Sequence, residues 1–164
     1  MCQCCRDASS LDIVDKSKIE TCSKDIISLL KNDVYIVIFQ QDNHENLKYR
    51  WKSIYSYSTP SMASLSHDTE NIASSILSTE DAIRQLNIGL RVDDLVSYNL
   101  SCHSSKIYTH ILDTPAGSLR LVIINKAAES EEVADDPDVN NRLKKISHSI
   151  KRALSASPST HNTK

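Results

Sequence analysis

Three of the five cysteines lie within the first five residues, and cysteine has the most reactive side chain in this chain. Cys2 and Cys5 have the C-x-x-C spacing of half a zinc site, but no second pair with ligand spacing follows. A mobile terminus without a ligand is the simplest alternative. The third interpretation is S-acylation of Cys2, Cys4 and Cys5, because two attached lipids hold a protein stably on a membrane.

Cys102 and His103 are the best candidates for a nucleophile and its base. Adjacent residues on a strand point to opposite faces, so the two side chains cannot act on each other. Paired carboxylates such as Asp93-Asp94 fall in expected loops, where water keeps their acidity ordinary. We therefore expect a non-catalytic protein that binds neither a metal nor another cofactor.

Composition excludes several classes of protein. The chain has 164 residues with a net charge of −2, so we expect one domain without a general attraction to nucleic acid. Its two glycines cannot form a glycine-rich phosphate loop or a dinucleotide fingerprint. No apolar run is long enough to span a bilayer and no signal peptide is visible. Five cysteines without a framework pattern favour a reducing, cytoplasmic compartment.

Helical periodicity occurs in three segments. Residues 17–31 begin with a capping box, Ser17 to Glu20, and continue with apolar residues at helical spacing. A second helix follows the serine-rich loop 60–66 and ends before Gly89. Its apolar residues fall on one stripe that either faces the sheet or contacts a partner: Ile72, Ile76, Ile83 and Leu86. A third helix starts at Asp136-Pro137-Asp138.

Strand patterns alternate with these helices. Val34–Phe39 is apolar on both faces, and residues 47–52 then alternate as the return strand of a hairpin. Three more strands are expected near residues 95–100, 106–112 and 118–126, the last two joined by a Pro-Ala-Gly turn. The sequence predicts an α+β fold, a five-stranded antiparallel sheet flanked by helices. The domain spans residues 17–154, after a flexible cysteine-containing segment (1–16) and before a disordered tail (155–164).

Charge is segregated near the C-terminal end. Residues Glu129–Asp138 contain six acids and residues Arg142–Arg152 contain five bases. The simplest interpretation is a solvated loop followed by a helix with a basic outer face. That face could contact anionic headgroups, although the apolar stripe of the helix is better used for packing on the sheet.

The pattern resembles the longin-fold, profilin-like small subunits of the TRAPP vesicle-tethering complexes, the sybindin-like group. The resemblance covers residues 33–126. It lies in the strand Val34–Phe39, the segment Lys48-Tyr-Arg-Trp51, the helix Asn71–Leu86, and the strand and turn from Tyr108 through Thr114-Pro-Ala-Gly117. It departs from that family in having about thirty residues and a helix before the first strand.

The resemblance implies a scaffold subunit in vesicle-mediated, ER–Golgi transport. Such a chain packs on other subunits, and the composite surface engages a Rab-type small GTPase. It implies a cytoplasmic protein peripheral to Golgi or ER membranes, with the stripe from Ile72 to Leu86 as its candidate contact helix.

The helix before the first strand is similar to the roadblock family, a second and more distant resemblance. Roadblock modules form platforms for small GTPases on endolysosomal membranes. Acylated Cys2, Cys4 and Cys5 would suit a lipid-anchored scaffold of that kind.

Overall fold

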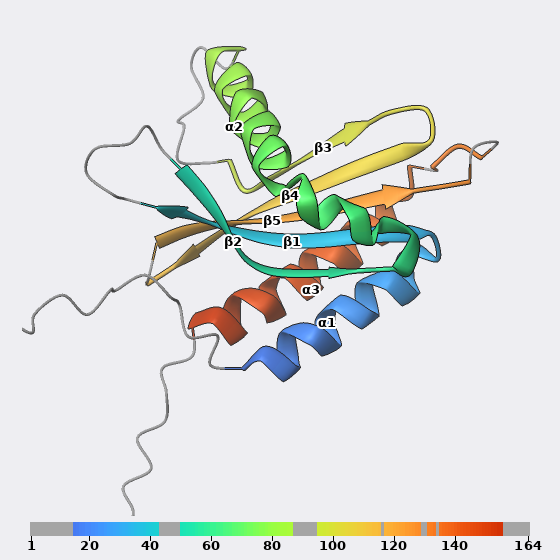
Figure 1. Ribbon diagram of the computed structural model, residues 1–164, viewed down its shortest axis with the longest axis horizontal. Helices are drawn as coiled ribbons and strands as arrows, with labels where there is room; N and C mark the ends of the chain where they lie inside the picture. The colour runs from blue at the N-terminus through green and yellow to red at the C-terminus, as the bar shows by residue number, and fades with distance from the viewer. Residues whose placement is uncertain are drawn as a thin grey trace, which may run out of the picture.

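The computed structural model describes residues 15–42, 50–86, 95–115, 117–128, 131–133 and 135–155. A five-stranded antiparallel sheet forms the middle layer, with helices on both faces (Figure 1). The strands are Asp33–Asp42 (β1), Arg50–Ser58 (β2), Ser97–Ser101 (β3), Ser105–Thr114 (β4) and Gly117–Lys126 (β5). The helices are Lys16–Leu30 (α1), Thr69–Leu86 (α2) and Pro137–Ser155 (α3). The predicted α+β fold is confirmed, and it is consistent with a longin-like architecture.

The sheet has the strand order β2-β1-β5-β4-β3. The first and last strands of the chain, β1 and β5, are therefore neighbours in the middle of the sheet, with Val37 opposite Val122. Both are covered on both faces, which explains why Val34–Phe39 is apolar at every position. β2 and β3 are the two edge strands.

Helices α1 and α3 lie side by side on one face of the sheet (Figure 1). Ile19, Ile26, Leu143 and Ile150 are buried there against the inward residues of β1 and β5. The Ser23 hydroxyl lies 3.1 Å from the Tyr55 hydroxyl, which ties α1 to β2. The predicted capping box is wrong.

The first turn of α1 is capped instead by Asp15, whose carboxylate accepts a hydrogen bond from the backbone N–H of Lys18. Ser17 lies inside the helix and donates its hydroxyl to the same carboxylate. Aspartate satisfies a free amide as well as serine does, and it favours the positive end of the helix dipole. The helix therefore begins at Lys16, one residue before the start that the sequence pattern predicts.

Helix α2 and a 3-10 helix, Pro60–His67 (η1), cover the opposite face of the sheet. The serine-rich loop expected at residues 60–66 is therefore a helical turn, with Pro60 in the first position, where its missing N–H costs nothing. Met62 of η1 and Ile76 of α2 pack on Tyr35, Val37 and Phe39 of β1.

Two turn predictions are confirmed. Gly117 begins β5 with φ +123°, a conformation that residues with a Cβ rarely adopt. Asp136 precedes α3, and its carboxylate accepts a hydrogen bond from the N–H of Asp138 at 2.9 Å. Gly89, residues 43–49, the cysteines at positions 2, 4 and 5 and the tail from residue 156 lie outside the described residues.

Candidate protein-interaction surface

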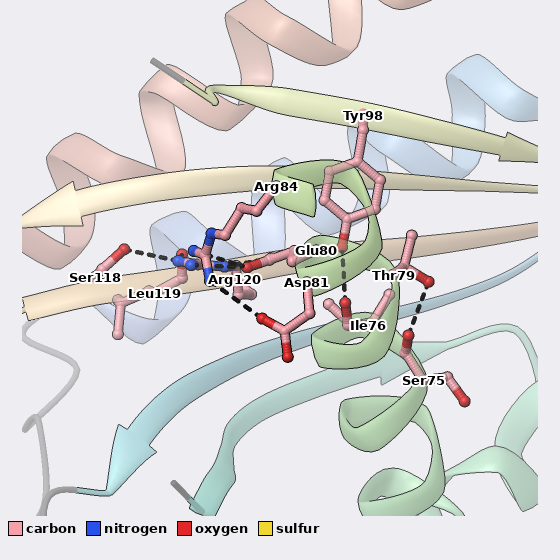
Figure 2. Close-up of polar contacts among 10 residues, drawn as sticks. All are labelled: Ser75, Ile76, Thr79, Glu80, Asp81, Arg84, Tyr98, Ser118, Leu119 and Arg120. Carbon is pink, nitrogen blue, oxygen red and sulfur yellow. Dashed lines mark hydrogen bonds and ion pairs between the residues drawn. The ribbon is translucent and has the colours of Figure 1, made fainter. Parts of the chain in front are cut away.

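A buried ion pair fastens α2 to the sheet. Glu80, on the inner side of α2, and Arg120, in the middle of β5, are 1% and 6% exposed. The Arg120 Nε donates to Glu80 Oε1 at 2.6 Å, and its Nη2 donates to Oε2 at 3.1 Å (Figure 2). A bidentate guanidinium–carboxylate pair is directional as well as strong, so it fixes the position of α2 along the strand.

Other groups complete the surroundings of this pair. The Arg120 Nη1 donates to the Ser118 hydroxyl at 2.6 Å and to the Leu119 carbonyl at 3.2 Å. The guanidinium carbon lies 4.9 Å from the centre of the Trp51 ring on β2, a cation–π distance. Arg84 approaches Glu80 Oε2 from the solvent side at 3.6 Å. The buried charges are thus paired and hydrogen-bonded, as their burial requires.

Tyr98 joins the edge strand β3 to the same cluster. Its hydroxyl lies 3.4 Å from both the Ile76 carbonyl and Glu80 Oε1, and donates toward them (Figure 2). Burial, followed by the nearby Glu80 carboxylate, raises the pKa of Tyr98, so its hydroxyl keeps its proton. β3 and α2 therefore form one connected unit.

The four apolar residues predicted for α2 are not equivalent. Ile76 is buried in the core, and Ile72 and Ile83 are half-buried. Leu86 is 82% exposed, on the last turn of the helix. Of the two alternatives for this stripe, facing the sheet fits Ile76, whereas Leu86 is exposed because the end of α2 projects clear of the strands (Figure 1). Glu80 occupies a place on the inner stripe instead.

Three large apolar side chains are exposed among the described residues, and all belong to this side of the molecule. They are Leu86, Val96 (57% exposed) and Leu100 (36% exposed). Leu100 lies opposite Ile107, which packs in the core under α2, so it faces the α2 side of the sheet. Val96 immediately precedes β3, and its carbonyl accepts a hydrogen bond from the Ile111 N–H of β4 at 2.8 Å. We call Leu86, Val96, Leu100 and the free edge of β3 the interaction surface.

The two edges of the sheet are protected to different degrees. The ladder between β1 and β2 is interrupted by a bulge between Ile38 and Phe39, and β2 carries the exposed Lys52. Both features discourage pairing with another strand. β3 has the sequence Ser-Tyr-Asn-Leu-Ser and a regular ladder to β4, with neither a charge nor a proline in the strand. Among the described residues, the β3 edge is therefore the one left open to a partner strand.

The fold does not bring the remaining candidate catalytic or metal-binding residues together. Cys102 and His103 are both exposed in the turn between β3 and β4, where the Cys102 N–H donates to the Ser105 carbonyl. Within the described ranges, no three His, Cys, Asp or Glu residues are close enough to hold a metal. A surface pocket of about 360 Å³ is lined by Lys16 at the start of α1 and by residues 53–56 of β2. The segment containing Cys2, Cys4 and Cys5 is outside the described residues.

Sequence reasoning missed the pair of Glu80 and Arg120, although the sequence contains two signals for it. Glu80 follows Ile76 by four residues, so it lies on the apolar stripe of its helix. Arg120 is flanked by leucines and is the one charge in the apolar run Leu119–Ile124 of β5. Two opposite charges, each out of place in an apolar pattern, are candidates for one buried pair.

Comparison with known proteins leaves the family of the chain open. No protein-family model, curated protein or solved structure matches the chain. No helix in the described part of the chain could cross a membrane. A function must therefore be inferred from the geometry of the interaction surface.

Proposed function

We propose that this chain is a non-catalytic subunit of a vesicle-trafficking assembly of the TRAPP-like tethering kind. It acts through protein–protein surfaces, and the assembly engages a Rab-type small GTPase. In this proposal the protein is cytoplasmic and peripheral to Golgi or ER membranes. The trafficking context comes from the resemblance of residues 33–126 to the sybindin-like subunits, and the mode of action comes from the fold.

The observation that carries the proposal is the position of the exposed apolar residues. Val96 and Leu100 lie at an edge of the sheet that no described strand covers, and Leu86 ends the helix that covers the same face of the sheet. An apolar patch next to a free strand is typical of a protein-binding site. The ion pair of Glu80 and Arg120 fixes α2 against the sheet, so the surface is preorganised before a partner arrives.

A second small sheet-and-helix subunit suits this surface best. Its edge strand would continue the ladder beyond β3 while an apolar side chain covers Leu86. Backbone hydrogen bonds give such a contact its affinity, and Val96 and Leu100 give it specificity. The joined sheets then present a wider platform for the GTPase than either subunit alone.

A roadblock-like scaffold for small GTPases on endolysosomal membranes is the second candidate. The observation that favours it is α1, which precedes β1 and packs beside α3 as an integral part of the core. S-acylation of Cys2, Cys4 and Cys5 would supply the membrane attachment of this candidate. Triple substitution of these cysteines by serine, followed by cell fractionation, tests that attachment: unchanged membrane association removes it.

The test of the interaction surface is purification of the tagged full chain from its own cells. We expect one or more small subunits in stoichiometric amount, with vesicle-tethering or endolysosomal proteins distinguishing the two candidates. The double variant Leu86→Asp/Leu100→Lys should lose these partners. It places charges on a surface that must become dry, without touching the buried core.

Ser56→Lys is the matched control, because Ser56 is exposed on the opposite edge strand, β2. It should retain every partner. Recovery of the wild-type chain as a monomer would overturn the proposal. Equal retention of partners by the double variant and by the control would overturn the assignment of the surface.

A further inference from the structure

The outer side of α3 carries a row of basic side chains that the core does not use. Lys144, Lys145, His148 and Arg152 are all exposed, and they recur at the spacing of one helical face. The whole helix contains five bases and one acid, Asp138, which is already paired with Arg142 at 3.2 Å. This basic row is opposite in sign to the net charge of −2 on the chain.

The apolar side of α3 is fully used in packing. Leu143, Ile150 and Leu154 are buried between the helix and the sheet. The row therefore cannot be the polar side of a helix that inserts its apolar stripe into lipid. It can act only as a charged surface on a helix held rigidly by the fold.

Helix α1 widens this surface. It lies beside α3 on the same face of the sheet (Figure 1). Its outward residues include the hydroxyl residues Ser17 and Thr21, and Lys24, which pairs with Glu20 at 3.2 Å. α1 contains three lysines against two acids, Glu20 and the exposed Asp25, so the neighbouring helix does not cancel the basic row.

The location of the row separates it from the interaction surface. α1 and α3 cover one face of the sheet, and α2 covers the other. The N-terminal end of α1 lies beside the C-terminal end of α3 (Figure 1). A protein partner on the α2 side would leave the basic row free.

We propose that the basic row of α3 docks this chain on an anionic lipid surface. The attraction is electrostatic, between lipid headgroups and the cations of Lys144, Lys145 and Arg152, with the half-buried Lys151 next to the row. Neither α1 nor α3 contains Trp, Tyr or Phe. The layer thus lacks the aromatic platforms on which nucleic-acid bases stack and the aromatic anchors of protein interfaces. Spaced cations on the outer side of two adjacent helices favour a membrane surface.

The experiment uses the full chain produced without acylation, so that attached lipids cannot contribute. Sedimentation is compared for phosphatidylcholine vesicles with and without about 30% phosphatidylserine. We expect binding only to the anionic vesicles, weakening as salt rises. The variant Lys145→Gln/Arg152→Gln should bind about 25-fold more weakly, since each cation near such a surface contributes about fivefold.

The control variant is Gln85→Glu/Lys126→Gln. It lowers the net charge by the same amount at two exposed positions outside α1 and α3. Its vesicle binding should stay within about twofold of wild type, and circular dichroism should be unchanged in both variants. Equal binding to both vesicle types, or an equal loss in the control, would overturn the proposal. So would tighter binding to RNA or polyglutamate than to anionic vesicles at the same salt.

Discussion

Glu80 and Arg120 form a bidentate ion pair in the layer between α2 and the sheet, although 40 residues separate them in the chain. Each charge is buried, and each depends on the other for compensation. A buried ion pair often only offsets the cost of its own desolvation, so this pair need not add much net stability. Its main effect is to fix the position of α2 on the sheet.

Removing one member of the pair should lower the free energy of unfolding much more than replacing both members with apolar residues. Glu80→Ala leaves the Arg120 guanidinium buried without a carboxylate, and we expect it to lower the free energy of unfolding by about 3–5 kcal/mol. The double variant Glu80→Leu/Arg120→Met should recover most of that loss. Urea denaturation of the wild type, of Glu80→Ala and of the double variant measures these free energies of unfolding. A double variant no more stable than Glu80→Ala would show that the surroundings, rather than the pair, determine the stability.

His110 should make the fold sensitive to acid. Its side chain lies under α3, and Nε2 has no hydrogen-bond partner in the part of the chain that the structure describes. Burial, and then the nearby His148 and Lys144, lower the pKa of His110 to about 4. In the unfolded chain this pKa is about 6.5. Between about pH 4 and pH 6.5, His110 is therefore protonated in the unfolded chain but not in the folded chain.

Stability should therefore be highest above about pH 6.5 and fall as the pH drops toward 4, with up to about 3 kcal/mol of the loss due to His110. Urea denaturation of His110→Leu from pH 7.5 to 4.5 should show a shallower decline than wild type. His67→Gln, at an exposed histidine of η1, is the control and should follow wild type. Parallel profiles for all three proteins would contradict the role of His110.

Gly117 should resist substitution because of its backbone rather than its surroundings. At φ +123° an ordinary residue is strained, although a Cβ added there would meet nothing within 4 Å. Gly117→Ala should cost about 1–3 kcal/mol in thermal or urea unfolding. Gly117→D-Ala, introduced by chemical ligation, should cost far less, because its mirror-image preference suits a positive φ. Equal losses for both would point to a clash instead.

The helices and strands can be predicted from the sequence because β-branched content, apolar periodicity and helix caps largely determine them. β1 and β5 are dense in β-branched residues, and α3 has a continuous apolar stripe with an aspartate at its start. Element type was therefore predictable except in η1 and in the second half of β2, which runs to Ser58 rather than ending near residue 52. In η1 a serine-rich composition suggested a loop, but Met62 is buried against the sheet and favours a helical turn.

The interaction surface was only partly predictable. The helix that carries Leu86 was recognised, but which of its apolar residues stay exposed depends on where α2 ends relative to the sheet. That position is set by Glu80 and Arg120, two residues whose charges suggested solvent exposure. Val96 and Leu100 looked like ordinary strand residues, because nothing in their local sequence shows that β3 is an edge.

The pairing of β1 with β5 has a consequence for how this protein is made. Asp33 emerges from the ribosome 93 residues before Lys126, its neighbour in the finished sheet. Until then β1 has an exposed apolar edge and can pair only with β2. Such distant pairing slows folding and prolongs the time during which aggregation can occur. The nascent chain is thus expected to need a chaperone until its final strand is complete.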